Sequence, residues 1–379
     1  MKRLLAASFT LAVCQNALAF VPAPPAIDGT SYVLMDYASG DILASKDPQA
    51  RVAPASITKV MTVYIAFDLM KKGQLHADDP VLISERAWRT GLDSSASRMF
   101  VKVGSQVPVA ELLKGIVIQS GNDAAIALAQ HIAGSERAFA ELMNQYAVKL
   151  GMAHTHFDNA TGLPDPDHYT TAHDLAILAR ALIHDFPERY KLFAEKDYTY
   201  NQIHQLNRNQ LLFEDPSVDG IKTGFTDAAG YCLMASALRS DRRLISVVMG
   251  TKSEKYRASA NESLLNYGFR FFETDRLLGA GSPALQARVY KGAVENVAVG
   301  TQEPVYLGIA RGSRDQLKLV PQLQSTLVAP ISAGQRVGEA TITLDGKPVK
   351  QVPLEALQAV PQGGLWRRMV DQIRLWLED

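Results

Sequence analysis

Apolar residues in the first three quarters of the chain follow two rhythms. A spacing of three and four residues, which buries one face of a helix, predicts helices at 54–73, 108–119, 122–132, 171–184 and 259–272. Alternating or continuously apolar runs predict a hairpin over 31–44 and strands at 218–223, 230–238 and 243–250. Helices interleaved with strands indicate one α/β or α+β domain, which we expect to span residues 20–275.

The pattern changes near residue 275. The segment Gly279–Pro283 has the glycine and proline content of a linker. Short alternating runs then predict strands at 287–290, 296–299, 305–310, 316–319 and 341–344. Leu344-Asp345-Gly346-Lys347 has the aspartate–glycine pair of a tight hairpin. We therefore expect a small all-β domain at 276–360, and it shows no catalytic cluster.

The last segment, residues 361–379, has a third pattern. On a helical projection its apolar residues form one stripe with Leu375 outside it, and charged residues fill the other side; the stripe contains Leu365, Trp366, Met369, Val370, Ile373, Trp376 and Leu377. A helix this short cannot span a bilayer, but it can lie in the membrane interface with its tryptophans buried. We expect residues 362–379 to bind a membrane surface. The alternative is docking on the protein itself or within a homodimer.

The N-terminus changes the expected location of the protein. Lys2 and Arg3 precede the apolar run Leu4–Val13, and Ala17-Leu18-Ala19 has the small-residue pattern of a cleavage site. Residues 1–19 are therefore interpreted as a secretory signal peptide. Its removal leaves two more acidic than basic side chains, and this balance gives no reason to expect nucleic-acid binding.

Cysteine and histidine offer little chemistry. After cleavage only Cys232 remains, in an apolar strand-like run, so we interpret it as a core residue and expect no disulfide. His154, His156 and Asp158 alternate and could share one strand face as metal ligands, with His168 and His173 nearby. No H-E-x-x-H motif accompanies them, so we expect neither a metal nor another cofactor.

Three short motifs carry the candidate chemistry: Ser56-Ile57-Thr58-Lys59, Ser120-Gly121-Asn122 and Lys222-Thr223-Gly224. Ser56 and Lys59 are three residues apart at a helix start and therefore share a face. A serine hydroxyl becomes a good nucleophile only when a base takes its proton. Lys59 is that base if it is neutral, and the helix dipole together with a second lysine, Lys222, would lower its pKa.

The remaining motif residues supply the other parts of serine acyl transfer without a histidine base. Ser120 could relay a proton to the leaving amine, and Asn122 could bind a substrate backbone. Thr223 could bind a carboxylate, and Gly224 lets a substrate lie close to the strand. The backbone N–H groups of Ser56 and Phe225 fit the need for an oxyanion hole.

With these motifs the chain resembles the low-molecular-mass penicillin-binding proteins, serine D-alanyl-D-alanine carboxypeptidases of the peptidase S11 type. The resemblance extends to Gln119–Ala124, Asn159–Pro164 and Asp219–Gly224. It implies a fold similar to serine β-lactamases and removal of the terminal D-alanine from peptidoglycan pentapeptides through an acyl-enzyme that β-lactams trap. It also implies that Arg257 helps to hold the substrate carboxylate, and that the enzyme acts at the periplasmic face of the cytoplasmic membrane.

One position departs from the family. Relatives often have histidine directly after Lys-Thr-Gly, whereas this chain has Phe225. The backbone N–H survives that exchange, so the expected oxyanion hole is unaffected. The side chain changes the rim of the pocket, and with it the expected speed of deacylation.

Other functions stay open at this point. A D,D-endopeptidase would use the same motifs. A class A β-lactamase would need a Glu-x-x-Leu-Asn loop, and the matching segment reads Phe157-Asp158-Asn159-Ala160-Thr161. A non-catalytic wall scaffold would not need intact motifs. Asp174 follows Thr171 in a capping-box pattern, and we interpret it as a helix-start acid that could pair with an arginine.

Overall fold

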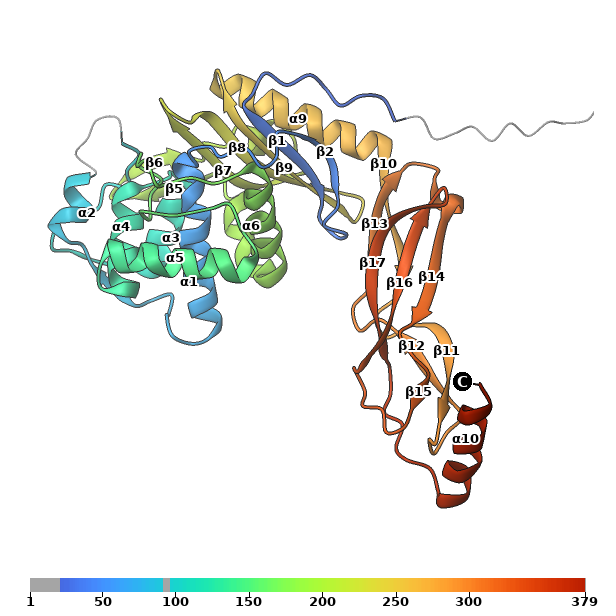
Figure 1. The fold of residues 1–379 in the computed structure, drawn as a ribbon. Coiled ribbons are helices and arrows are strands. Elements are labelled where there is room, and N and C mark those ends of the chain that lie inside the picture. The colour runs from blue at the N-terminus through green and yellow to red at the C-terminus, as the bar shows by residue number, and fades with distance from the viewer. Residues whose placement is uncertain (1–20, 91–95, 379) are drawn as a thin grey trace, which may run out of the picture.

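The computed structural model describes residues 21–90 and 96–378. The expected signal peptide lies outside these residues. Figure 1 shows a helix-covered sheet joined to a β-rich arm, with a terminal helix near the far end of that arm. This is the expected mixed α/β body followed by an all-β region.

The body is built on a five-stranded antiparallel sheet with the order β2-β1-β9-β8-β7. Its strands are β1 (Ser31–Asp36), β2 (Ile42–Lys46), β7 (Val218–Thr226), β8 (Gly230–Arg239) and β9 (Arg242–Thr251). The expected 31–44 hairpin and the three later strands are confirmed. The central strands are continuously apolar because both faces of the sheet are covered.

Helices cover the two faces unequally. One face packs on a large helical core formed by α1 (Lys59–Lys71), α3 (Val109–Ile118), α4 (Asn122–Ala133), α5 (Glu136–Leu150) and α6 (Ala172–Asp185). The other face packs mainly on α9 (Glu254–Phe271), and Leu211 and Leu212 of the short helix α8 (Leu211–Glu214) belong to the same core. Successive residues alternate between the two cores: Val33 and Met35 face the first, and Leu34 faces the second.

Shorter elements complete the body. They are α2 (Glu85–Thr90), α7 (Pro187–Tyr190), α8 (Leu211–Glu214), the 3-10 turn η2 (Lys191–Ala194), and the strand pairs β3 (Pro80–Leu82) with β4 (Gln106–Pro108) and β5 (Asp197–Tyr200) with β6 (Ile203–Leu206).

The structure shows where three of the expected helices begin. Ser56 lies in a 3-10 turn, η1 (Ala55–Thr58), and the α-helix begins only at Lys59. Helix α9 begins at Glu254, five residues before the expected start, because the Ser253 side chain caps the backbone N–H of Tyr256. The Thr171 cap is confirmed, since its hydroxyl accepts from the N–H of Asp174.

Among the residues that the structure describes, no arginine pairs with Asp174. Its carboxylate accepts from the His154 N–H at 2.8 Å and from the Thr155 hydroxyl at 2.7 Å. It therefore ties the start of α6 to the segment after α5, which corrects the expected arginine partner.

The β-rich region contains a six-stranded sheet with the order β14-β16-β17-β12-β11-β15 and a separate β10–β13 pair. Its strands are β10 (Phe272–Leu278), β11 (Pro283–Tyr290), β12 (Asn296–Gly300), β13 (Val305–Ala310), β14 (Leu317–Leu323), β15 (Leu327–Val328), β16 (Arg336–Leu344) and β17 (Lys347–Ala356), with a 3-10 turn η3 (Arg314–Gln316). The Leu344–Lys347 hairpin is confirmed. Strand β10 crosses residue 275, so the expected linker after it is a turn between β10 and β11.

The terminal helix α10 (Leu365–Glu378) docks on this region through its polar side. The buried Asp371 carboxylate accepts from the Lys291 N–H at 2.7 Å, and the Lys291 amine donates to Gln372 at 2.6 Å. The apolar stripe points to solvent, with Trp366 74% and Trp376 77% exposed. Among the described residues, no helix combines the length and apolar character needed to cross a membrane.

Candidate active site

Ser56 and Lys59 are in direct contact. The 3-10 turn places them on one face, and the Lys59 amine donates to the Ser56 hydroxyl oxygen at 2.9 Å. The same amine donates to the Thr161 carbonyl at 2.7 Å. Two acceptors therefore fix the amine beside the hydroxyl.

Burial determines the protonation of Lys59. The side chain is fully buried, and this burial lowers the pKa of Lys59 to about 7. The Asp123 carboxylate acts in the opposite direction, and Arg208 lowers the pKa further. Burial and Arg208 thus make a neutral amine available near neutral pH.

Lys222 lies in the same electrostatic environment. It is buried on β7, and its amine donates to the Thr223 carbonyl at 3.2 Å. Burial lowers the pKa of Lys222 well below its usual value, and the positive charges of Lys59, Arg208 and Arg257 add to this effect. The charge of Lys59 therefore disfavours protonation of Lys222.

Ser120 lies on the turn between α3 and α4. Its backbone has a φ of +66°, which is rare outside glycine, and its buried hydroxyl has no hydrogen-bond partner among the described residues. Such strain with an unpaired polar group is typical of a functional position. Asn122 follows as the buried first residue of α4.

The Asp123 side chain holds the Ser120 turn against residues 99–100. Its carboxylate accepts from the backbone N–H groups of Met99 at 2.8 Å and Phe100 at 3.0 Å. This role of Asp123 was not predictable from the sequence, because backbone donors leave no residue-type signature.

Strand β7 forms an edge of the sheet next to the serine. A Cβ on Gly224 would lie 3.2 Å from the Ala55 Cβ, so the strand and the 3-10 turn approach closely. Thr223 is buried beside it. An unpaired strand edge can pair with an extended peptide, as the expected role of β7 requires.

Arg257 extends from α9 to this strand. Its guanidinium donates to the Gly224 carbonyl at 3.2 Å and to Glu254 at 3.4 Å. It also lies 5.6 Å from the centre of the Tyr231 ring. The arginine therefore lies at the level of the Lys-Thr-Gly motif.

Phe225 is 47% exposed and packs on Tyr231 with ring centroids 4.2 Å apart. The phenylalanine that replaces the family's frequent histidine thus forms an aromatic pair beside Arg257.

Sequence reasoning did not assign a role to the Asn159–Leu163 loop. The Asn159 side chain accepts from the N–H groups of Thr161, Gly162 and Leu163, and so presents the Thr161 carbonyl to Lys59. The Asn-x-Thr-Gly sequence, typical of a side-chain-stabilised turn, was the available indication. Arg208 was also missed, because its influence depends on a long-range approach.

The histidine and cysteine candidates have structural roles. His168 is buried, contacts the Thr58 hydroxyl at 2.9 Å, and has its pKa lowered to about 4 by burial. His156 bonds the Asp167 carbonyl and stacks on Tyr169. Within the described residues, no group of three or more His, Cys, Asp or Glu side chains could hold a metal ion. Cys232 is a buried core residue, as expected.

Comparison with solved structures places this fold among the penicillin-binding proteins. The structure of penicillin-binding protein 5 from Haemophilus influenzae superposes with a TM-score of 0.86 and 42% identity, covering 90% of this chain and all of that one. Penicillin-binding protein D2 from Listeria monocytogenes, in its cefotaxime-bound form, gives a TM-score of 0.60 and 27% identity over 66% of this chain and all of that one.

Sequence comparison is more specific. Residues 18–253 match the D-alanyl-D-alanine carboxypeptidase family, peptidase S11, and residues 272–362 match the penicillin-binding protein 5 C-terminal domain. The D-alanyl-D-alanine carboxypeptidase DacA of Escherichia coli K12 is 44% identical over 95% of this chain and 90% of its own length. The chain belongs to the D-alanyl-D-alanine carboxypeptidase family, which confirms the resemblance seen in the motifs.

Proposed function

We propose that this serine D-alanyl-D-alanine carboxypeptidase uses Ser56 as its nucleophile and Lys59 as its general base. The contact that carries the proposal is the 2.9 Å hydrogen bond from the Lys59 amine to the Ser56 hydroxyl, with a lysine pKa of about 7. Neutral Lys59 takes the hydroxyl proton while Ser56 attacks the carbonyl of the penultimate D-alanine of a peptidoglycan pentapeptide.

The next steps use the other two motifs. The terminal D-alanine leaves as its amine receives the proton held by Lys59, relayed through Ser120 and Lys222, whose side chains are buried. The N–H groups of Ser56 and Phe225 stabilise the oxyanion. Water then cleaves the acyl-enzyme, which restores the Ser56 hydroxyl.

Substrate binding falls to the strand and its neighbours. Gly224 and Thr223 on the β7 edge pair with the peptide backbone, and Asn122 binds it from the opposite side. Arg257 and Lys222 attract the terminal carboxylate, for which a fork of guanidinium donors is well suited. β-Lactams acylate the same serine and remain attached as covalent adducts.

Mass spectrometry and product release together test these assignments. Wild-type protein should release D-alanine from a peptide ending in D-Ala-D-Ala and should carry a penicilloyl group on Ser56. A Ser56→Ala variant should do neither while keeping the wild-type unfolding temperature. An adduct on another residue, or D-alanine release by the variant, would refute the mechanism.

We also propose that the protein is exported by residues 1–19 and held at the periplasmic face of the cytoplasmic membrane by residues 362–379. The exposed apolar stripe of α10 supports this anchor, because its polar side is already used for docking on the β-rich region. The division into regions 20–275, 276–360 and 361–379 belongs to the same proposal.

Deletion of residues 362–379 should release the protein from membranes and from phospholipid vesicles without loss of D-alanine release. A Trp366→Ala, Trp376→Ala double variant should reproduce the loss of vesicle binding with the helix retained. Continued vesicle binding by the deletion protein would contradict the anchor. Conversion of a dimer to a monomer with unchanged vesicle binding would assign α10 to a homodimer.

A further inference from the structure

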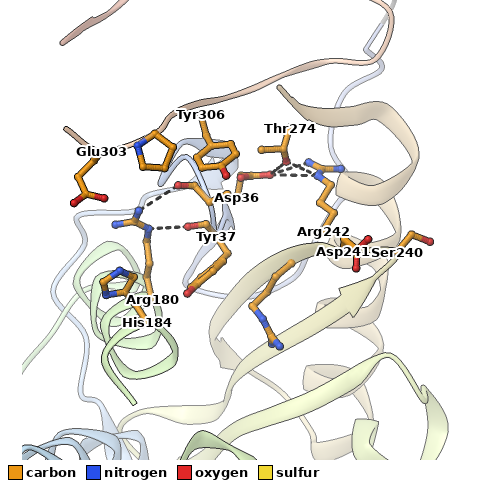
Figure 2. Close-up of a pocket in the computed structure, with 13 residues that line it drawn as sticks. Asp36, Tyr37, Arg180, His184, Ser240, Asp241, Arg242, Thr274, Glu303 and Tyr306 are labelled. Atoms are coloured by element: carbon orange, nitrogen blue, oxygen red, sulfur yellow. Dashed lines mark hydrogen bonds and ion pairs between the residues drawn. The ribbon is translucent and has the colours of Figure 1, made fainter. Parts of the chain in front are cut away.

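A cavity separate from the candidate active site lies at the junction between the five-stranded sheet and the β-rich region. It has a volume of about 730 Å³, within the range typical of small-molecule sites at domain interfaces. Figure 2 shows its walls: the turn after β1, helix α6, the β8–β9 turn, β10 and the segment from β12 to β13. No candidate active-site residue lines it.

This cavity is far from the nucleophile. Arg243, in its wall, and Thr251, whose hydroxyl bonds the Tyr231 carbonyl beside Phe225, occupy opposite ends of β9. Eight residues of extended strand separate them by roughly 26 Å. A ligand in the cavity would therefore not take part in the reaction at Ser56.

Most of the charge around the cavity is neutralised within the protein. Arg242 pairs with Asp36 at 3.2 Å, and Arg243 pairs with Asp219 at 2.6 Å. Arg180 donates to the carbonyls of Tyr37 and Ala38. The lining residues therefore do not concentrate unpaired charge of one sign, so the cavity does not favour a polyanion.

Two polar groups remain available on opposing elements. Arg180 on α6 uses Nε and one terminal nitrogen for carbonyls, which leaves its other terminal nitrogen without a partner among the described residues. Glu303, between β12 and β13, makes no ion pair with a described residue. Figure 2 shows both side chains in the cavity wall. They offer one donor and one acceptor to a neutral polar ligand.

Tyr37 and Tyr306 add aromatic surface to the same walls. Both rings are partly exposed, and neither hydroxyl bonds a described residue. A tyrosine that combines an open ring face with a free hydroxyl suits a ligand with both apolar and polar faces.

A smaller cavity of about 300 Å³ adjoins this one. Arg180, Glu303, Pro304 and Tyr306 line both cavities. The smaller cavity is also lined by Thr301, whose buried hydroxyl has no hydrogen-bond partner among the described residues. An unpaired buried hydroxyl calls for a ligand or a water. The two cavities therefore adjoin along these shared residues, and we refer to them together as the groove.

We propose that this groove, lined by Tyr37, Arg180, Glu303 and Tyr306, binds the glycan strand of peptidoglycan. Its N-acetylglucosamine units are neutral, and its muramic acid units are neutral where a peptide is amide-linked to the lactyl carboxyl. Both sugars carry hydroxyl and amide groups and present apolar ring faces to aromatic side chains. The inference rests on the proposed function only in taking peptidoglycan as the polymer that the enzyme meets. The groove holds the enzyme on that polymer while the distant serine acts on a peptide.

Calorimetry with a tetramer and with a hexamer of N-acetylglucosamine, both neutral, tests the site. Both probes should bind wild-type protein and the Ser56→Ala variant equally. Tyr306→Ala and Glu303→Gln should each weaken binding by roughly fivefold. Trp366→Ala, which removes an exposed aromatic outside the groove, should bind as wild type.

A kinetic comparison provides a second measurement. Tyr306→Ala should release D-alanine from a short sugar-free peptide at the wild-type rate, but should show a raised KM on isolated peptidoglycan sacculi. Unfolding temperatures establish that each variant is folded. Absence of binding of both oligomers by wild type, or wild-type affinity in both Tyr306→Ala and Glu303→Gln, would overturn the site. Failure of D-alanine release with intact glycan binding would refute the mechanism at Ser56 alone.

Discussion

At the scale of single residues, burial sets the chemistry of Lys59. A lysine on the surface would be protonated at neutral pH and could not accept a proton from Ser56. Inside the protein, loss of hydration destabilises the ammonium ion, and the pKa of Lys59 falls to about 7. The rate of serine acylation should therefore rise as pH increases through this value and level off above it.

Arg208 provides a direct test of this electrostatic argument. Its positive charge lowers the pKa of both Lys59 and Lys222. In Arg208→Ala the protonated lysines lose a repelling neighbour, so the rising limb of kcat/KM for penicillin acylation should move to higher pH. Arg137→Ala, which removes a 92% exposed arginine from α5, should leave the limb in place. A limb that stays fixed or moves to lower pH in Arg208→Ala would contradict the argument.

From its contacts with Tyr231, we expect the Phe225 side chain to affect substrate binding near Arg257 rather than the speed of deacylation considered from the sequence. The Phe225 ring packs on Tyr231, and Arg257 lies over the same tyrosine. Phe225→Ala removes this packing but keeps the backbone N–H, so KM for a D-Ala-D-Ala peptide should rise several-fold with little change in kcat. Tyr231→Phe keeps the aromatic pair and serves as the control. A fall in kcat of more than about tenfold would instead place the Phe225 side chain in the chemistry.

At the scale of elements, sequence patterns predicted what packing periodicity and caps encode. The strands β7, β8 and β9 and the Thr171 cap of α6 follow from apolar runs and local hydrogen bonding. The 3-10 turn at Ser56 was not predicted, because residues three apart share a face in either kind of helix. The start of α9 was missed because its first turn is polar and has no apolar period.

The three motifs of the candidate site were predictable from the sequence, but the groups that surround Lys59 were not. Lys59 needs the Thr161 carbonyl and the buried surroundings of α1, and neither is a property of residue type. The Asn159–Leu163 loop is therefore an element whose importance only the packing reveals.

Gly162 connects this loop to the serine turn. It has a φ of +85°, and an added Cβ would lie 1.7 Å from the Ala55 carbonyl oxygen. Gly162→Ala should therefore push the loop away from Ser56, destabilise the protein by more than ~2 kcal/mol and abolish penicillin acylation. Chemical denaturation and acylation kinetics measure the two effects.

Gly104→Ala is the matched control for backbone strain. Gly104 has a φ of +74° with nothing within 4 Å of an added Cβ. This variant should lose only about 1–2 kcal/mol and should keep its acylation rate. Equal effects of the two substitutions would show that the close approach to Ala55 is unimportant.

At the scale of the whole molecule, a polar junction fixes the β-rich region on the sheet. Asp36 is fully buried, accepts from Arg242 and the Thr274 hydroxyl, and so connects β1, β9 and β10. The β-rich region in turn carries α10 near its far end (Figure 1). If α10 lies on a membrane, this junction sets where the serine is held above the surface.

The Lys350 side chain contributes to this junction without belonging to the hydrophobic core of the body or of the β-rich region. Its amine donates to the Ser39 carbonyl at 3.0 Å and to Asp41 at 3.2 Å, across the boundary between β17 and the β1–β2 turn. Lys350→Met should increase the radius of gyration in X-ray scattering and speed proteolysis near β10, because a partly buried charged hydrogen bond is lost. D-alanine release from a short peptide should stay at the wild-type rate, since no active-site residue contacts Lys350.

Lys347→Met, on the exposed β16–β17 turn, should change none of these quantities. A Lys350→Met protein with wild-type scattering and proteolysis would show that the remaining contacts hold the junction without this lysine.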